Sequence, residues 1–559
     1  MLDVCIIGGG PAGSTAATFL RKYNPELSVL VLERDVFPRD HIGESLLPPI
    51  CHILQEMGCW QKVEDADFPV KIGATFKWGS NDKLWDFSFL GTDEFEDEPR
   101  PGRFKGQRQF TAFQVDRSIF DEILLDHAAE LGAEVRENTR VKDVEMDGDR
   151  VAAVLLEDGE RIEARYFLDC TGNVGLMRRK LDIEADEPTS LRNIAIWDYW
   201  QNAEWAVSLG NGGTRILVMS VGFGWLWFIP ITKTRTSLGL VIPAEYYKES
   251  GLDKEAMYLK GIEAEPHIAK LVASATRENK TTATKDWSHI CQRLYGENWF
   301  MVGECAGFAD PILSAGLTLA MSGAREVACT IAELERGEFE ADWLKERYEE
   351  NQKSRIGQHI RFANFWYAGN GIFTDLEKYT AEMAKDCGLD MDPKRAFRWI
   401  GTGGFTHENP GLASVGVFSL GAIKNFSERF YDGSVEFKIN EMSEFRMNLA
   451  GAEQSKIPIY NNGRVTPVLC YRRDGKLLPM YGPWQAAVRA LGRAYKADAI
   501  LASLRSQYGG DEIGVGGALE ALEAMVGAGW VTGKKTSSGK TIRYLVGGAI
   551  RETSDIENP

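Results

Sequence analysis

Cysteine pairs and long apolar runs are both missing from this sequence. Its nine cysteines lie scattered between Cys5 and Cys470, with no C-x-x-C pair and no spacing typical of a zinc site. This excludes a disulfide framework and predicts reduced thiols in a cytoplasmic protein that holds no metal. The most apolar stretch, residues 216–231, is short and interrupted by two glycines and a proline. We therefore expect a buried strand or hairpin there and no membrane span.

Basic residues are also too few for a chain that coats a polyanion. Lys and Arg number 64 against 81 Asp and Glu, which gives a net charge of -17. This balance argues against bulk electrostatic binding to nucleic acid or to an anionic membrane, although it leaves local basic patches open. Because 559 residues are too many for one small core, we expect two or three domains.

The first 33 residues carry a dinucleotide-binding pattern. A β-rich apolar run at residues 3–7 leads into Gly-Gly-Gly-Pro-Ala-Gly and a helical run, and a second apolar run ends at Glu33. This order predicts that a pyrophosphate lies on the helix N-terminus and that Glu33 binds the adenosine ribose. The pattern by itself does not separate NAD from FAD. The residues that it assigns to the nucleotide are Gly8, Gly10, Ala12, Gly13 and Glu33.

Three later segments resemble those of the FAD monooxygenases and their relatives, and they favour FAD. Residues 37–48 resemble the early flavin-contacting segment, and residues 166–172 and 300–306 resemble the second and third nucleotide segments. In the third, the family's strand delivers a carboxylate to the ribityl chain, usually from Asp, where this chain has the longer Glu304. The resemblance implies an α/β fold, with a Rossmann-type FAD-binding domain and an inserted mixed β-sheet substrate domain. The further residues that it assigns to FAD are Arg39, Gly43, Glu44, Ser45, Arg117, Asp169, Gly172, Gly303, Glu304, Asp310, Pro311 and Gly316.

Two tryptophans at alternate positions narrow the family. Residues 224–230, Gly-Trp-Leu-Trp-Phe-Ile-Pro, resemble the W-x-W-x-I-P signature of flavin-dependent halogenases. Trp225 and Trp227 are expected on the same face of a strand. In that family the pair is thought to keep an NADPH-type hydroxylase reaction from operating near the flavin. The plainer interpretation is that both indoles fill a core.

A second halogenase-like segment follows the third nucleotide segment. Residues 308–316 match the F-x-D-P-x-x-S-x-G pattern of halogenases that act on phenols, pyrroles and carrier-bound substrates. A turn of small residues can present successive backbone N–H groups and so bind an anion without a basic side chain. We expect Ser314, Ala315 and Gly316 to bind chloride or bromide in this way. The same residues also suit a simple turn before the next helix.

Lys71 is the residue to which the resemblance assigns the chemistry. It opens the segment Lys-Ile-Gly-Ala-Thr-Phe-Lys-Trp-Gly, which is similar to the halogenase segment whose first lysine points into the tunnel between flavin and substrate. There the ammonium would donate a hydrogen bond to hypohalous acid, or the amine would form a haloamine. A lysine at the start of a strand is otherwise usually a solvated surface residue, and Lys77 is the neighbouring alternative.

Two positions refine the comparison with branches of the family. Tryptophan halogenases carry Glu before the Ser of the Pro-x-x-Ser stretch, where this chain has Leu313. This argues against free tryptophan as the substrate and favours phenolic, pyrrolic or acyl groups. Asp286, in Asp-Trp-Ser, resembles a segment of the carrier-related branch. A covalent ester from Asp286 to the flavin 8-methyl position is a hypothesis, and a strand-end Asp is the alternative.

The C-terminal third predicts mainly helices and loops. Residues 360–400 look helical and aromatic, and in the family such helices cap the substrate cavity. Beyond residue 480, two helices followed by a hairpin of residues 530–535 and 541–546 resemble a winged-helix module. Its second helix has two Glu and no Lys or Arg, which favours packing or protein docking over DNA binding.

The expected domains follow from these segments. Residues 1–350 would form the FAD-binding fold, with the substrate sheet inserted at about 70–115 and 190–285. Residues 351–480 would be a helical and loop cap over the substrate cavity, and residues 481–559 the winged-helix-like module.

The function implied is that of a two-component halogenase. FADH2 would come from a separate flavin reductase, since a second dinucleotide fingerprint is missing. With oxygen and chloride or bromide, it would halogenate a small or carrier-tethered substrate, in antibiotic-type secondary metabolism. The alternatives are a single-component FAD/NADPH aromatic hydroxylase, a flavin-dependent reductase of isoprenoid chains and, in another class, a flavoprotein regulator acting through the C-terminal module.

Overall fold

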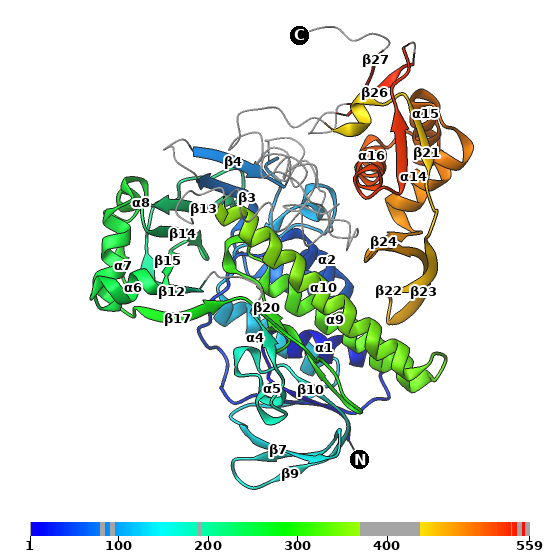
Figure 1. The fold of residues 1–559 in the computed structure, drawn as a ribbon. Coiled ribbons are helices and arrows are strands. Elements are labelled where there is room, and N and C mark those ends of the chain that lie inside the picture. Colours follow the sequence, from blue (N-terminus) through cyan, green and yellow to red (C-terminus); the bar gives the residue numbers. More distant parts are fainter. Residues whose placement is uncertain are drawn as a thin grey trace. The chain divides into compact units, whose positions relative to one another are not determined.

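The computed structural model describes residues 2–78, 84–89, 95–187, 192–368, 437–537, 539–544 and 550–553. The chain divides into two compact units (Figure 1). Unit 1 comprises Met1–Ile372 with Tyr460–Val465, and unit 2 comprises Phe373–Ile459 with Thr466–Pro559. This division does not separate residues 351–480 from residues 481–559, so the three-domain division stays a prediction. Within the described ranges no helix is both long and apolar enough to cross a membrane.

A parallel sheet forms the nucleotide end of unit 1. Its strand order is β19-β10-β1-β2-β6, and each neighbouring pair runs parallel. Its central residues are apolar on both faces, as expected of a parallel sheet that is covered on both sides. The predicted order of strand, turn, helix and strand is confirmed. The elements are β1 (Leu2–Ile7), α1 (Pro11–Tyr23), β2 (Val29–Leu32), β6 (Glu134–Arg136), β10 (Ala164–Asp169) and β19 (Trp299–Met301).

Helices pack against this sheet and against one another. α1 contacts both α4 (Arg117–Glu130) and α9 (Gly316–Arg336), and α9 contacts α10 (Ala341–Ala368). The break between α9 and α10 comes at Gly337, which caps α9 in the left-handed region with φ 65°. α10 runs across the boundary expected at residue 350.

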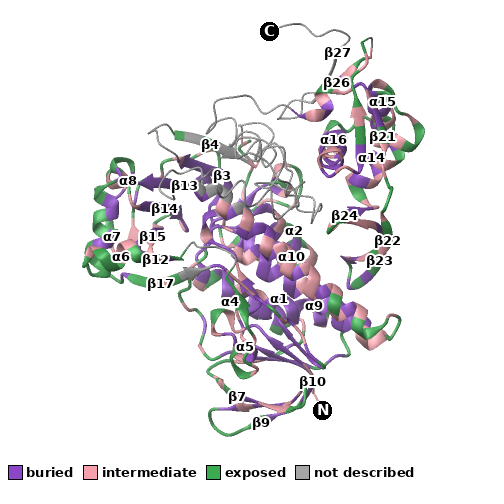
Figure 2. Cartoon of the chain, viewed as in Figure 1, coloured by how far each residue is buried: buried purple, intermediate pink, exposed green. Residues whose placement is uncertain are grey.

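A mixed sheet forms a second layer of unit 1 with its own buried cluster. Its order is β16-β12-β15-β14-β13-β3-β4, with β17 paired to β12 and β5 to β3. Both predicted inserts contribute its strands, and β3 lies parallel to β13 with β4 and β5 antiparallel on its other side. β13 and β14 are buried along their whole length (Figure 2). The strands are β3 (Val70–Lys77), β4 (Leu84–Ser88), β5 (Ala112–Phe113), β12 (Arg192–Gln201), β13 (Gly213–Val221), β14 (Gly224–Pro230), β15 (Arg235–Pro243), β16 (Thr276–Arg277) and β17 (Thr282–Trp287).

Smaller elements complete unit 1. β7, β8 and β9 form an antiparallel sheet, and β11, β18 and β20 form another. The remaining elements are α2 (Pro48–Met57), α3 (Trp60–Asp65), β7 (Val141–Asp147), β8 (Arg150–Leu156), β9 (Arg161–Ile162), α5 (Leu176–Lys180), β11 (Ala185–Asp186), α6 (Ala244–Ser250), α7 (Lys254–Glu263), α8 (Pro266–Leu271), β18 (His289–Cys291) and β20 (Gly307–Phe308), with the 3-10 turns η1 (Gly106–Gln109), η2 (Gly172–Val174), η3 (Gly303–Cys305) and η4 (Pro311–Leu313).

Unit 2 has its own apolar core, in which three helices pack with short strands. The strands of residues 444–479 lie where helices and loops were expected. Outside the described residues lie 369–436, which cover most of the predicted aromatic cap. The elements are η7 (Lys438–Glu441), β21 (Glu444–Met447), β22 (Glu453–Asn461), β23 (Arg464–Arg473), β24 (Lys476–Pro479), α14 (Gly482–Arg493), α15 (Ala497–Gln507), α16 (Glu512–Gly527), β25 (Val531–Lys534), β26 (Thr541–Tyr544) and β27 (Ile550–Thr553).

The predicted C-terminal hairpin is wrong, although its strands lie close to the expected places. β25 pairs with β21, about 85 residues earlier in the chain, and β26 pairs with β27. The turn-like residues 537–540 predicted a local hairpin, but the long-range pairing forms instead. It is favoured because Phe445 on β21 and Val531 on β25 are buried in the core of unit 2. The winged-helix-like assignment is therefore not confirmed.

Candidate active site

The turn after β1 has the shape that a dinucleotide requires. Gly8 has φ +108°, and a Cβ there would lie 2.4 Å from the carbonyl oxygen of Cys170. A Cβ on Gly13 would lie 1.9 Å from the carbonyl oxygen of Gly8. Gly10 caps α1 without a side-chain hydrogen bond, so the first N–H groups of this helix can point at a phosphate. The geometry fits the pyrophosphate of FAD.

Glu33 directly follows β2 and lies beside this turn. Its carboxylate accepts hydrogen bonds from the backbone N–H groups of Gly9 at 2.6 Å and Asp35 at 2.9 Å. These bonds orient the carboxylate at the place where the sequence puts the adenosine ribose, and each oxygen keeps a further lone pair to accept from a hydroxyl. The role of Glu33 toward the ribose stays a prediction.

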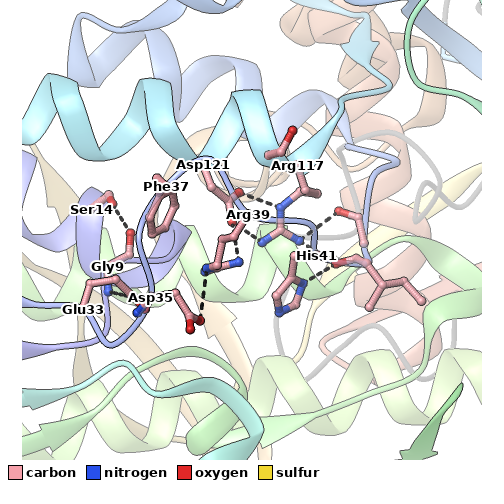
Figure 3. A network of polar contacts seen from close by, with 12 residues as sticks. Gly9, Ser14, Glu33, Asp35, Phe37, Arg39, His41, Arg117 and Asp121 are labelled. Atoms are coloured by element: carbon pink, nitrogen blue, oxygen red, sulfur yellow. Dashed lines mark hydrogen bonds and ion pairs between the residues drawn. The ribbon is translucent and has the colours of Figure 1, made fainter. Parts of the chain in front are cut away.

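Two predicted cofactor arginines share one buried carboxylate (Figure 3). Arg117 forms a bidentate pair with Asp121 at 2.6 and 2.8 Å, and Arg39 lies 3.5 Å from the same carboxylate. Arg117 also donates to the carbonyl oxygens of Ile42 at 2.7 Å and Gly43 at 3.3 Å. Asp121, which the sequence did not indicate, thus holds the early flavin-contacting segment in place. Its signal is the i,i+4 spacing from Arg117 on α4.

The second and third nucleotide segments meet at two glycines in the left-handed region. Gly172 has φ +62° and Gly303 has φ +78°, and a Cβ on Gly172 would lie 3.8 Å from a carboxylate oxygen of Glu304. Burial raises the pKa of Glu304, while the charge of Arg117 opposes that rise. Glu304 thus lies in η3, just after β19, and its contact with FAD stays a prediction.

Asp169 behaves differently from the other predicted contacts. Its carboxylate accepts hydrogen bonds from the backbone and the hydroxyl of Thr171, at 3.1 and 2.6 Å, and from the backbone of Met177 at 2.7 Å. The side chain is fully buried. Asp169 therefore shapes the turn after β10, and a direct contact with the cofactor stays a prediction.

Lys71 lies on β3 with its side chain inside the protein. Only 2% of the residue is exposed, and its ammonium lies 5.4 Å from the centre of the Phe89 ring. Within the described part of the chain it has no hydrogen-bond or ion-pair partner. Burial consequently lowers the pKa of Lys71 to about 7, because an unpaired ammonium loses its hydration. Lys77, on the same strand, instead forms an ion pair with Glu265.

The paired tryptophans lie side by side on β14, and both are buried. Their ring centres are 6.1 Å apart, and the ring of Trp78 lies 6.3 Å from that of Trp225. Gly239 on β15 makes room for Trp227, since a Cβ at Gly239 would lie 2.1 Å from the indole. The indole N–H of Trp225 donates to the hydroxyl of Tyr367 at 2.9 Å, and that of Trp227 to Ser237 Oγ at 3.1 Å.

The predicted halide turn joins η4 to α9. Ser314 adopts the left-handed region with φ 56°, and its N–H donates to the carbonyl oxygen of Pro311 at 2.9 Å. The donor expected from Ser314 is therefore already engaged. Ala315 and Gly316 stand at the start of the 21-residue α9, where the first N–H groups have no acceptor inside the helix and favour an anion.

Asp310 precedes this turn and is buried. It accepts from the backbone N–H of Ile312 at 2.8 Å and from the hydroxyl of Tyr367 at 3.2 Å. Burial raises the pKa of Asp310 to about 7. Tyr367 lies near the end of α10, and only its membership of an aromatic run marked it in the sequence. Asp286 pairs through its backbone with Asn193, but its side chain lies outside the described residues, so the ester stays a hypothesis.

Comparison with known proteins finds a matching family model and similar enzymes. The model of the FAD binding domain family matches residues 1–363. A tryptophan 2-halogenase of Chondromyces crocatus is 33% identical over 64% of this chain and 66% of its own. A 1H-pyrrole-2-carbonyl-[peptidyl-carrier protein] chlorinase of Pseudomonas fluorescens is 31% identical over 66% of this chain and 85% of its own.

Two solved structures of flavin-dependent halogenases are also similar to this chain. The chondrochloren halogenase CndH superposes with a TM-score of 0.60 at 30% identity, covering 70% of this chain and 90% of that protein. The flavin-dependent halogenase CmlS superposes with a TM-score of 0.72 at 25% identity, covering 97% of each chain. Fold and site thus define an FAD-binding oxidoreductase. Within that class the chain belongs to the flavin-dependent halogenases, as the resemblance predicted.

Proposed function

We propose that this enzyme halogenates a phenolic, pyrrolic or carrier-tethered substrate through Lys71. The buried amine without a partner among the described residues carries the proposal, because only the neutral amine is nucleophilic. Reduced FAD, when bound, supplies with oxygen the oxidising power that turns halide into hypohalous acid. Lys71 then either donates a hydrogen bond to that acid or takes the halogen from it: the N–halogen bond forms, the O–halogen bond breaks, and water leaves. Attack by the substrate carbon returns the free amine.

The other residues of the site bind and shield. The backbone at Ala315 and Gly316 would hold the halide, and Trp225 and Trp227 would wall the path between flavin and substrate. FADH2 would come from a separate flavin reductase. The substrate class is supported by the Leu313 position and by the carrier-protein substrate in the name of one relative, while another relative is named for tryptophan.

The test supplies the purified protein with FAD, a flavin reductase, NADH, oxygen and bromide. Activated phenols and pyrroles, free and carrier-bound, and free tryptophan are then screened for bromine by mass spectrometry. We expect bromination of a phenol, a pyrrole or a carrier-bound substrate. Oxygenated product without bromine, especially with NADPH alone, would support the aromatic hydroxylase instead. Bromination of free tryptophan would overturn the substrate class and leave the halogenase reaction standing.

Halogen transfer is expected to depend on pH through Lys71. Because the pKa of Lys71 is lowered to about 7, the neutral fraction of the amine rises about tenfold per pH unit below that value and levels off above it. The rate of substrate bromination in single-turnover experiments should follow this curve. In parallel, the release of hypobromous acid to a trap is measured in the Lys71→Met variant. Its rate should not show the tenfold rise per pH unit below pH 7. A flat bromination profile between pH 5.5 and pH 8.5, a window of about 1.5 units on either side of this pKa, would contradict a neutral-amine mechanism.

A further inference from the structure

The two signature tryptophans make the same pattern of hydrogen bonds in different directions. An indole N–H can only donate. Trp227 donates to the hydroxyl of Ser237 at 3.1 Å, and Trp225 donates to the hydroxyl of Tyr367 at 2.9 Å. A hydroxyl that already accepts from an indole keeps its own proton for a further acceptor. Next to each of these two hydroxyls lies a buried carboxyl group.

The first carboxyl group belongs to Glu44, in the early flavin-contacting segment. Ser237 lies next to this carboxyl and lowers its pKa, and the hydroxyl of Tyr199 donates to it at 3.0 Å. Glu44 is 2% exposed. Burial raises the pKa of Glu44, whereas the two hydroxyls and the charge of Arg117 hold that rise down. These groups come from β12, β15 and α4, the elements around the carboxyl.

The second carboxyl group belongs to Asp310, at the turn before α9. The hydroxyl of Tyr367 donates to it at 3.2 Å, and the backbone N–H of Ile312 donates to it at 2.8 Å. The side-chain amide of Asn193 adds a longer bond of 3.4 Å to the Tyr367 hydroxyl. Burial raises the pKa of Asp310, and the bonds from Ile312 and Tyr367 lower it. Two series of residues thus start from adjacent indoles. Trp227 leads through Ser237 to the early flavin-contacting segment, and Trp225 leads through Tyr367 to the predicted halide turn.

We propose that the tryptophan pair is a positioning device: through Ser237 and Tyr367, its two indole N–H groups orient the buried carboxyl groups of Glu44 and Asp310. Bulk alone does not account for this arrangement, since a ring of similar size without an N–H would fill the same space. Ser237 and Tyr367 are then positioning residues, and their hydroxyl protons are held on the carboxyl groups. The inference concerns residues of this chain and needs neither the substrate nor the halogenation step of the proposed function.

The test follows the two carboxyl groups directly in the FAD-loaded protein. Infrared difference spectra across a pH titration report protonated carboxyl groups, and the Glu44→Gln and Asp310→Asn variants assign the bands. A hydroxyl that donates to a carboxylate favours its charged form. Ser237→Ala should therefore raise the pKa of Glu44 by about one pH unit, and Tyr367→Phe should do the same for Asp310. Ser237→Ala should leave the pKa of Asp310 unchanged, and Tyr367→Phe should leave the pKa of Glu44 unchanged.

Two further variants separate positioning from packing. Ser237→Thr keeps the hydroxyl and should restore the titration of Glu44. Trp227→Phe keeps an aromatic ring but removes the N–H donor. It should raise the pKa of Glu44, as Ser237→Ala does, by a smaller amount. Retained FAD absorbance and circular dichroism show that each variant is folded. An unchanged Glu44 titration in folded Ser237→Ala, or a Thr variant that behaves like Ala, would overturn the proposal.

Discussion

Replacing Lys71 by methionine is expected to abolish halogenation while oxidation of FADH2 by oxygen continues. Methionine fills a similar volume on β3 but offers neither an amine nor an N–H donor to hypohalous acid. The rate of halogenation should fall by more than about a thousandfold. Among the described residues, no side chain is hydrogen-bonded to Lys71 that could take over the role of its amine. Brominated product by mass spectrometry and NADH consumption, followed in the same reactions, measure the two halves of the result.

Stability provides the internal control for this variant. Wild-type Lys71 must lose a proton or remain an unpaired charge, and its folded pKa of about 7 lies below its ordinary 10.5. The unfolded chain therefore binds more protons, and the penalty is full below pH 7 and disappears as the pH rises toward 10.5. Lys71→Met should raise the free energy of unfolding by roughly 4 kcal/mol at neutral pH. A folded, more stable and inactive variant excludes unfolding as the cause.

Lys77 offers a matched comparison on the same strand. Lys77→Met removes the ion pair with buried Glu265 and should lower stability, while bromination continues. Loss of bromination in Lys77→Met with retention in Lys71→Met would reverse the assignment of the two lysines.

Gly13→Ala is expected to abolish FAD binding. The new Cβ would lie 1.9 Å from the carbonyl oxygen of Gly8, a backbone atom that cannot move without opening the turn between β1 and α1. The N-terminus of α1 would then no longer face the pyrophosphate. Flavin absorbance of the purified variant, and titration with added FAD, should show affinity reduced by at least about a hundredfold.

The control for this change is Gly492→Ala in α14. Nothing lies within 4 Å of a Cβ built there, and alanine favours a helix over glycine by about 1 kcal/mol. This variant should bind FAD like wild type. Normal FAD content in Gly13→Ala would show that the pyrophosphate binds elsewhere.

The nucleotide end could be predicted because its information is local. The strand, the glycine turn, the helix and Glu33 follow one another within 33 residues, and each step has its own physical requirement. Lys71 was harder, because a lysine at a strand start is usually solvated. Its burial depends on β13 and β5, which flank β3 and come from distant parts of the chain. Only the similarity of its whole segment to the halogenases revealed it.

The residues that sequence reasoning missed act across long separations. Tyr367 connects to Trp225 over 142 residues and to Asp310 over 57, and Ser237 on β15 lies next to Glu44 in the segment before α2. No local spacing reports such contacts. The pairing of the C-terminal strands was predicted wrongly for the same reason. The sequence shows the turn-like tetrapeptide between β25 and β26, but it does not show that β25 pairs with the distant β21.

The placement of Lys71 on an inner strand has a consequence for changing where a substrate reacts. β3 is bonded to β13 on one side and to β4 and β5 on the other, so the point of halogen delivery that we propose is fixed in space. A different carbon can be reached only if the substrate is turned or shifted in its cavity. Laboratory evolution for regioselectivity should therefore leave β3 intact and vary the side chains that orient the substrate.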